Sequence, residues 1–219
     1  MSGFSKNWQK KEDRGGGRGL ENLMRNSPPV KPQIDRASRE ISALIARLDN
    51  AEARIKSRDG EMFRKIVAGL QKGDRDHAAM YANELTQMRK VGTTVAGAKL
   101  ALEQVSLRLG TITDLGDVVS TLLPTVAVVK RVGQGLVSTM PTAQAELNEI
   151  SSLLSSTLVE AGTVSGTSLN FEAANSEAEK VLEEAASVAS ERMASQFPEV
   201  PEAAVPQRNE EEEEEGLAA

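Results

Sequence analysis

The sequence contains no cysteine, very few aromatic residues and no long apolar run. None of its 219 residues is Cys, and Phe, Trp and Tyr together make up 3%. The absence of cysteine excludes disulfides and thiolate chemistry and fits a cytosolic protein. So few aromatic side chains, without strand-like runs of Val, Ile, Tyr and Thr, disfavour a large compact core. We therefore expect an elongated all-α protein.

Membrane-spanning and export signals are also missing from the sequence. The most apolar segment, Val118 to Val129, is too short to cross a bilayer and contains Pro124. No N-terminal apolar run precedes a small-residue cleavage site, so we expect no signal peptide. These features predict a soluble protein whose contact with any membrane is peripheral.

Signatures of catalysis are missing as well. His77 is the only histidine, and no P-loop, His-Glu-x-x-His motif, paired carboxylates or Ser-His-Asp set can be assembled. The glycines at 15–19 have neither a preceding strand nor a following Lys-Ser pair, so they do not form a phosphate-binding loop. We predict that the protein is not an enzyme and uses no cofactor or metal.

What the sequence does contain is an apolar residue at every seventh position in two stretches. These residues are Ile34, Ile41, Leu48, Ile55 and Met62, and then Tyr81, Met88, Val95, Leu102 and Leu109. Such spacing places a narrow apolar seam on a long helix. Because Gly73-Asp74 separates the two stretches, they predict an antiparallel hairpin over 33–110, with helices over 33–72 and from residue 75 to at least 109. So thin a hairpin leaves no room for a pocket, so function should lie on its surfaces.

The sequence also predicts a soft region within the first hairpin helix and several shorter helices after the hairpin. Residues 57–60 should soften the first helix without breaking it. Residues 115–140, interrupted by Pro124 and several glycines, predict one or two short helices. Pro141 opens an amphipathic helix with an apolar face, a Gly/Ser/Thr linker follows at 162–168, and Ser176 with Glu179 forms a capping box for a helix that ends near Gln196.

The resulting organisation has four parts. Residues 1–32 form a flexible basic segment, in which Pro28, Pro29 and Pro32 keep the chain extended. Residues 33–168 form the helical core, and 169–196 a C-terminal regulatory helix. Residues 197–219, with three prolines and the glutamate run 210–215, should be a disordered acidic tail.

Charge is distributed unevenly along the chain. Residues 1–75 hold 17 Lys and Arg against 10 Asp and Glu, whereas residues 170–219 hold 3 against 14. The front is therefore basic and the back acidic. At low salt, this asymmetry should favour a closed form in which the C-terminal region folds back on the hairpin.

Two groups of residues are candidates for binding an anionic surface. On a helical wheel, six cations of the first helix lie within about 40° of one another and apart from the apolar seam, although Glu40 and Glu61 intrude. This group, the basic stripe, consists of Arg36, Arg47, Arg54, Arg58, Lys65 and Lys72. The second group combines aromatic and basic residues typical of an interfacial anchor: Phe4, Lys6, Trp8, Lys10 and Lys11. Both patterns fit an anionic membrane, and the scarcity of stacking aromatics disfavours nucleic acid.

A proline-containing segment near the C-terminus is the third candidate. In Phe197-Pro198-Glu199-Val200-Pro201, a stiff backbone alternates with apolar side chains. Such a segment can lie in a groove between helices of a partner, but it can equally be an ordinary linker.

The order of these parts resembles the ESCRT-III family, specifically its archaeal CdvB-type cell-division members. The resemblance rests on the long basic first helix, the turn at Gln71–Asp76, the segment Leu100–Leu109 and the amphipathic helix around Leu147–Leu158. It covers roughly residues 33–196. The proline segment Phe197–Pro201 looks like the family's proline-containing ATPase-binding motif.

The resemblance implies a membrane-bound filament that constricts or severs membranes in archaeal cell division. Implied partners are further copies of the chain, paralogous subunits, an anionic membrane, and an AAA ATPase whose MIT domain grips Phe197–Pro201. The implied location is cytoplasmic, on the inner face of the cell membrane at the division site. Two alternatives stay open: a PspA-like membrane-maintenance coat, and a coiled-coil adaptor or nucleic-acid tether.

Overall fold

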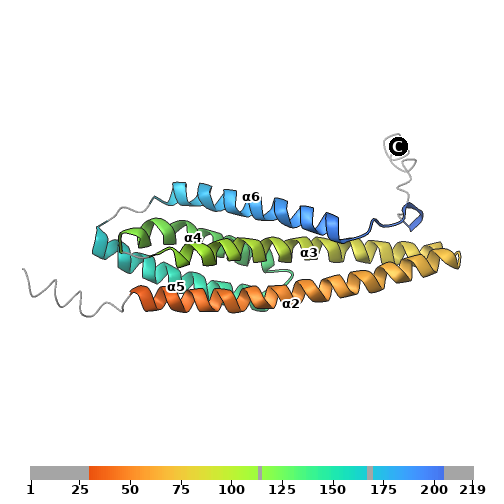
Figure 1. Ribbon diagram of the computed structural model, residues 1–219, viewed down its shortest axis with the longest axis horizontal. Helices are drawn as coiled ribbons and strands as arrows, with labels where there is room; N and C mark the ends of the chain where they lie inside the picture. The colour runs from red at the N-terminus through yellow and green to blue at the C-terminus, as the bar shows by residue number, and fades with distance from the viewer. Residues whose placement is uncertain (1–29, 113–114, 167–169, 205–219) are drawn as a thin grey trace, which may run out of the picture.

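The protein is an elongated helical bundle, seen in a computed structural model that describes residues 30–112, 115–166 and 170–204. These ranges contain five α-helices, one short 3-10 helix and no strand. The elements are α2 (Val30–Gln71), α3 (Arg75–Gly110), α4 (Leu115–Leu136), α5 (Pro141–Ser165), α6 (Phe171–Gln196) and η1 (Glu202–Ala204). Figure 1 shows the α-helices side by side along the length of the molecule. The all-α expectation is confirmed.

The helices α2 and α3 form the hairpin that the seven-residue spacing predicted. At the turn Gly73 has a φ of +76°, which glycine adopts without steric cost. Asp74 then caps α3 by accepting a hydrogen bond from the backbone N–H of His77 at 3.3 Å. The buried seam positions include Ile34, Ile41, Leu48, Val95, Leu102 and Leu109.

The helix α2 runs without interruption for 42 residues, or about 60 Å. It continues through residues 57–60, as predicted. It begins at Val30, however, so Pro32 lies inside its first turn rather than keeping the chain extended. Proline is tolerated there because the first backbone N–H groups of a helix have no partner within the helix.

The helix α4 is a single 22-residue helix, so of the one or two short helices expected over 115–140 only one forms in this range, and it is longer than expected. Pro124 lies within it, and the Thr125 hydroxyl donates to the Thr121 carbonyl at 2.7 Å. Leu122, Val129 and other apolar side chains of α4 are buried on both sides of the proline. Tertiary burial therefore outweighs the local cost of proline and glycine.

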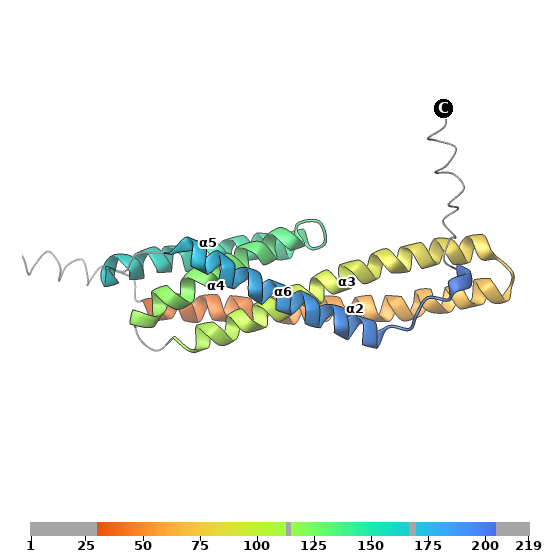
Figure 2. The same ribbon diagram turned by 90° about the horizontal axis from the view of Figure 1, so that it is seen from above.

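The helix α5 packs against α4 and α2 through the apolar face predicted from the sequence. That face is buried at Leu147, Ile150, Leu154 and Leu158. The helix extends to Ser165, so the expected linker at 162–168 begins too early, and Gly166 ends the helix at a φ of +66°. Figure 2 shows that the turn between α4 and α5 stops partway along the hairpin, which continues beyond it to its tip.

The helix α6 lies across α3 and α4. It begins at Phe171, where the Asn170 side chain accepts a hydrogen bond from the backbone N–H of Ala173 at 3.1 Å. The capping box predicted at Ser176 is therefore wrong, because Ser176 lies inside the helix. Its buried face consists mainly of alanine: Ala174, Ala178, Val181, Ala185, Ala189 and Met193, which we call the alanine seam.

Small residues on α3 let α6 approach closely. A Cβ placed on Gly92 would lie 2.6 Å from the Cε atom of Met193 and 3.3 Å from the Cγ2 atom of Ile55. A larger residue at this position would therefore require the flexible end of the Met193 side chain to move.

Two apolar clusters hold the described residues together. The larger one joins all five α-helices in the half of the molecule that contains α4 and α5. The smaller one, near the hairpin tip, contains Ile66, Ala78, Ala82, Leu85 and Ala204.

The segment after α6 takes part in the smaller cluster. We expected residues 197–219 to lack structure, but residues 197–204 lie against the hairpin, with Val200 packed on the smaller cluster and Ala204 buried in it. The sequence analysis assigned the apolar side chains of this stretch to a partner's groove, whereas they pack on the chain's own hairpin. The glutamate run lies outside the described residues.

Candidate functional surfaces

The basic stripe lies along the outside of α2. All six members of the stripe are exposed, on a face beside the one that carries the buried seam: Arg36, Arg47, Arg54, Arg58 and Lys65 on α2, and Lys72 in the turn directly after it. The helical-wheel expectation of two separate faces on one helix therefore holds for the described residues. An array of this kind attracts polyanions in a salt-dependent way.

The stripe is not a uniform row of unpaired cations. Arg36 pairs with Glu40 of the next turn at 2.8 Å, and the hydrogen bond that it donates to Glu40 raises the pKa of Arg36 above its usual value. Arg47 pairs with Glu146 of α5. Lys65 lies 5.5 Å from the centre of the Tyr81 ring on α3. The remaining arginines, Arg54 and Arg58, have no ion-pair partner among the described residues.

An open groove runs beside the middle of the stripe. It has a volume of about 690 Å³ and lies between α2, α3 and the turn that joins α4 to α5. One side carries Arg47, Arg54 and Arg58, and the floor is apolar, with Ile55, Met88 and Val91. Thr139 and Met140 of the turn also line it. We refer to it as the arginine groove.

The arginine groove contradicts the expectation that so thin a hairpin leaves no room for a pocket. One of its walls comes from the turn before α5, far along the chain from α2. Nothing in the spacing of the hairpin residues indicates where this turn lies. The arginines themselves were predicted as site residues, whereas Met88, Val91 and Met140 were not.

The proline segment Phe197–Pro201 lies on the hairpin. The Phe197 ring lies 5.2 Å from the guanidinium carbon of Arg89, and its backbone N–H donates to the Met193 carbonyl at 3.2 Å. Phe197 and Val200 are half-buried, whereas Pro198 and Glu199 are exposed. The apolar side chains of the segment are thus used for contacts within the chain.

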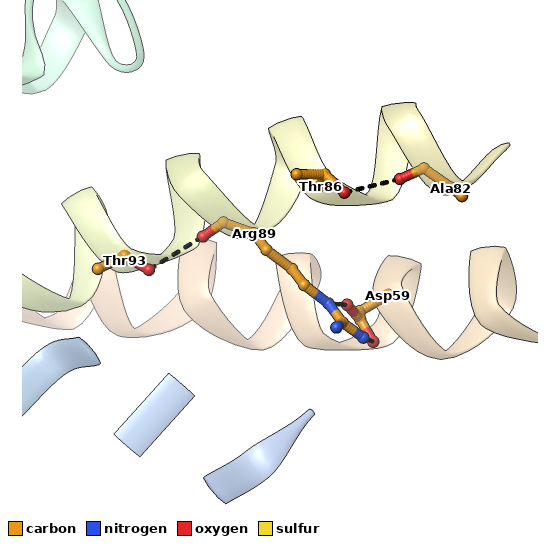
Figure 3. A network of polar contacts seen from close by, with 5 residues as sticks. All are labelled: Asp59, Ala82, Thr86, Arg89 and Thr93. Atoms are coloured by element: carbon orange, nitrogen blue, oxygen red, sulfur yellow. Dashed lines mark hydrogen bonds and ion pairs between the residues drawn. The ribbon is translucent and has the colours of Figure 1, made fainter. Parts of the chain in front are cut away.

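An ion pair between the two hairpin helices lies under this segment. Arg89 donates to Asp59 from Nε at 2.5 Å and from Nη2 at 3.1 Å (Figure 3). The Asp59 side chain is 2% exposed and that of Arg89 is 21% exposed. Sequence reasoning missed the pair. On a helical wheel, Asp59 nevertheless lies about 140° around from Arg36, within the sector that holds the apolar residues. A carboxylate at such a position signals a buried partner.

A second ion cluster ties the hairpin together. Lys99 of α3 donates to Asp49 at 2.6 Å and to Glu52 at 2.8 Å, both on α2. Burial acts to lower the pKa of Lys99, but the hydrogen bonds that it donates to Asp49 and Glu52 oppose this, and the net shift is upward. The side chain therefore stays charged.

The acidic residues of α6 pair with cations outside the basic stripe. Glu177 pairs with Arg108 of α3, and Glu179 pairs with Arg131 of α4 at 2.8 Å. The expected closed form, with the later helices folded on the hairpin, is the one observed. In the part of the chain that the structure describes, Glu146 of α5 forms an ion pair with the basic stripe, and no residue of α6 does.

Three further expectations concern the interfacial anchor, metal binding and membrane spanning. Phe4, Lys6, Trp8, Lys10 and Lys11 lie outside the described residues, so their role stays a prediction. Among the residues described, no cluster of His, Asp or Glu could hold a metal ion. None of the described helices is long and apolar enough to cross a bilayer.

The fold and its surfaces define a class of protein: a long helical hairpin with a basic face, covered along part of its length by amphipathic helices. Sequence comparison adds two curated relatives, both from Sulfolobus acidocaldarius. Cell division protein B1 is 36% identical over 186 residues, which cover 85% of this chain and 87% of the relative. Cell division protein B is 29% identical over 175 residues, which cover 78% of this chain and 67% of the relative.

The chain belongs to the archaeal CdvB-type cell division proteins, which are of the ESCRT-III type. This confirms the resemblance drawn from the sequence. No family model matches the chain, and no solved structure matches it.

Proposed function

We propose that this protein is a non-enzymatic subunit of a membrane-remodelling filament. It polymerises on an anionic membrane, constricts or severs that membrane during cell division, and is then disassembled by an AAA ATPase. Its partners are further copies of itself, paralogous subunits and the inner face of the cell membrane at the division site. The observation that carries the proposal is the exposed basic stripe on a hairpin of the CdvB type.

Membrane contact begins at the basic stripe. Arg54 and Arg58 have no ion-pair partner among the described residues, so binding lipid phosphates breaks no ion pair there. Arg47 is held by Glu146 of α5. An anionic membrane therefore competes directly with α5 for Arg47, and this competition favours release of α5 from the hairpin.

Polymerisation follows from the release of the covering helices. In the closed form, the apolar faces of α5 and α6 are buried on the hairpin and α4. Once released, these faces need a new apolar surface, which neighbouring subunits supply. The closed form thus represents the monomer before assembly.

Disassembly involves the proline segment Phe197–Pro201. An MIT domain would hold the apolar side chains of this segment, of which Phe197 and Val200 are half-buried against the hairpin. The same side chains cannot occupy both places. ATPase binding therefore requires residues 197–201 to leave the hairpin.

The test combines flotation with electron microscopy, using the full chain and vesicles that contain about a third anionic phospholipid. We expect the protein to float with these vesicles at low salt, to coat them with filaments, and to lose binding as salt rises. The triple variant Arg54→Glu, Arg58→Glu, Lys65→Glu should lose flotation. The matched control Lys130→Glu, Lys180→Glu, Arg192→Glu changes the same amount of charge at exposed positions outside the stripe and should float.

Other outcomes would replace the proposal. Flotation and filaments without binding of Phe197–Pro201 to an MIT domain would favour a PspA-like coat. Absence of flotation, with retardation of DNA or RNA in a gel, would favour a nucleic-acid tether. Absence of both would leave a coiled-coil adaptor.

A further inference from the structure

The arginine groove combines two chemistries that a merely electrostatic surface does not need. Arg47, Arg54 and Arg58 line one side, and the floor between α2 and α3 consists of Ile55, Met88, Val91 and Val95. Binding of a phosphate group alone would require only the arginines and not the apolar residues beside them. The combination fits a ligand with an anionic head and an apolar body.

The size of the groove favours a small amphiphile over a partner helix. Ligand pockets commonly occupy about 300–1,000 Å³ and are mostly apolar, with a few polar groups that fix orientation. The groove's volume of about 690 Å³ lies in this range, and six of its eleven lining residues are apolar. A helix about 10 Å wide would fill this volume with fewer than about two turns, too few for a stable helix contact.

The same arrangement disfavours a second copy docked face to face. Two grooves brought together would oppose their arginines, because Arg54 and Arg58 have no carboxylate partner among the described side chains. Like charges at such an interface repel. The missing partner is an anion.

We propose that the arginine groove binds one molecule of anionic phospholipid. Its phosphate lies between Arg54 and Arg58, and one acyl chain lies along Ile55, Met88 and Val91. The inference rests on the proposed membrane function and deepens it. Part of the basic stripe then acts as a stoichiometric lipid site rather than as a diffuse charge.

The position of the groove fits extraction of a lipid from a bilayer surface. Its arginines belong to the stripe, so the orientation that places the stripe on a membrane also places the head-binding side of the groove at the phosphates. Arg47 contributes once Glu146 releases it. Because Thr139 and Met140, next to α5, also line the groove, the lipid site belongs to the closed form, and release of α5 would remove part of its lining.

The test uses a soluble probe, dihexanoyl-phosphatidylglycerol below its micelle concentration, with the full chain labelled at its methionine methyl groups. Met88 and Met140 line the groove, whereas Met80 and Met193 do not. We expect saturable one-to-one shifts of the Met88 and Met140 signals in NMR spectra, with Met80 and Met193 unchanged. Glycerol phosphate, which lacks the acyl chains, and dihexanoyl-phosphatidylcholine, which lacks the net charge, should bind far more weakly.

Two variants separate the head and tail contributions. Arg54→Gln with Arg58→Gln should weaken binding of the probe at least about tenfold, because each removes a charged hydrogen bond. Val91→Ser should weaken it through loss of apolar contact. The control Lys130→Gln with Lys180→Gln should leave the affinity within about twofold, as expected for distant exposed sites.

Each other outcome overturns the inference. Flotation on vesicles without shifts from the soluble probe leaves the proposed function intact and removes the lipid site. Shifts at all four methionines, or equal shifts with the zwitterionic probe, indicate non-specific adsorption. Displacement of the probe by an acidic amphipathic peptide that itself binds more tightly assigns the groove to a protein partner. If neither vesicles nor the probe bind, the proposed function fails as well.

Discussion

Arg89 of α3 holds the carboxylate of Asp59 of α2 through two nitrogens, at 2.5 and 3.1 Å. The guanidinium also lies 5.2 Å from the Phe197 ring, measured to the ring centre. One arginine thus connects both hairpin helices and the segment that follows α6. Asp59 lies within residues 57–60, the stretch of α2 with the weakest sequence preference for a helix.

Removing one member of this pair should destabilise the protein markedly. Asp59→Ala leaves Arg89 largely buried without a counter-ion, and we expect a loss of about 3 kcal/mol in the free energy of unfolding. Urea denaturation followed by circular dichroism measures it. The double variant Asp59→Ala, Arg89→Met should be more stable than Asp59→Ala, since it leaves no unpaired charge.

An exposed ion pair serves as the control for this prediction. Arg36 and Glu40 pair on the surface of α2, and Arg36→Ala should leave the urea midpoint nearly unchanged. Equal destabilisation by Arg36→Ala and Asp59→Ala would show that burial of the Asp59 pair has no special effect.

The helix α6 should detach without unfolding the hairpin. Each alanine of its seam buries a single methyl group, worth about 0.8 kcal/mol, and its ion pairs to Arg108 and Arg131 are partly exposed. Ala185→Glu places a charge in the seam. We expect residues 171–196 to lose protection in hydrogen exchange while α2 and α3 keep theirs.

A substitution two residues away provides the comparison for the α6 prediction. Ser187 is exposed on the same helix, so Ser187→Glu should leave the exchange pattern unchanged.

A chain truncated after residue 169 should polymerise at concentrations where the full chain is monomeric. Sedimentation showing both chains as monomers would contradict the view that the closed form prevents assembly.

Docking of residues 197–204 should weaken binding of an MIT domain. Only the fraction of molecules with a released segment can bind, so the apparent affinity of the full chain falls by that fraction. A peptide spanning residues 195–206 should therefore bind more tightly than the full chain. Ala204→Glu, which puts a charge in the smaller cluster, should bring the affinity of the full chain up to that of the peptide.

Ala203 offers the matched control for this competition. It is exposed, whereas the neighbouring Ala204 is 1% exposed. Ala203→Glu should leave the affinity unchanged. Equal affinities of the peptide, the full chain and both variants for the MIT domain would mean that docking does not compete with binding.

The turn of the hairpin should respond to acid through Asp74. Hydrogen bonds from the side chain and backbone of His77 lower the pKa of Asp74 below its ordinary value of 3.8. Because the folded value is depressed, the stabilising contribution is present above pH 3.8 and is lost as the pH falls through the lowered pKa. The difference in thermal midpoint between the wild type and Asp74→Ala should therefore shrink under acid. A difference that stays constant down to pH 2 would contradict the assignment.

The hairpin could be predicted from sequence because its signal is repetitive. Ile34, Ile41 and Leu48 follow one seven-residue spacing. At the break, Gly73 readily adopts the positive φ that the chain reversal requires. Each apolar residue at this spacing is a further independent indication of the same helix face. A single unfavourable position, such as Gly60, therefore does not change the result.

Local rules failed where tertiary packing overrides them. Ser176 and Glu179 match a capping box, but Asn170 caps α6 one and a half turns earlier, since the seam already begins at Ala174. Pro124 and its neighbouring glycines indicated breaks, yet burial of Leu122 and Val129 keeps α4 whole. The arginine groove needs Met140 beside α2, a proximity that no short-range pattern encodes.

Anchoring of Ala204 near the hairpin tip determines how the molecule responds to mechanical load. A pull on the chain beyond residue 204 first meets Ala204 and Val200 in the smaller cluster, then Phe197 beside Arg89, and only then the C-terminal end of α6. The alanine seam would then peel open from Met193 towards Ala174, one contact after another, instead of shearing as a whole. Resistance to extraction is set by the strongest single contact along that path, not by the total area that α6 buries.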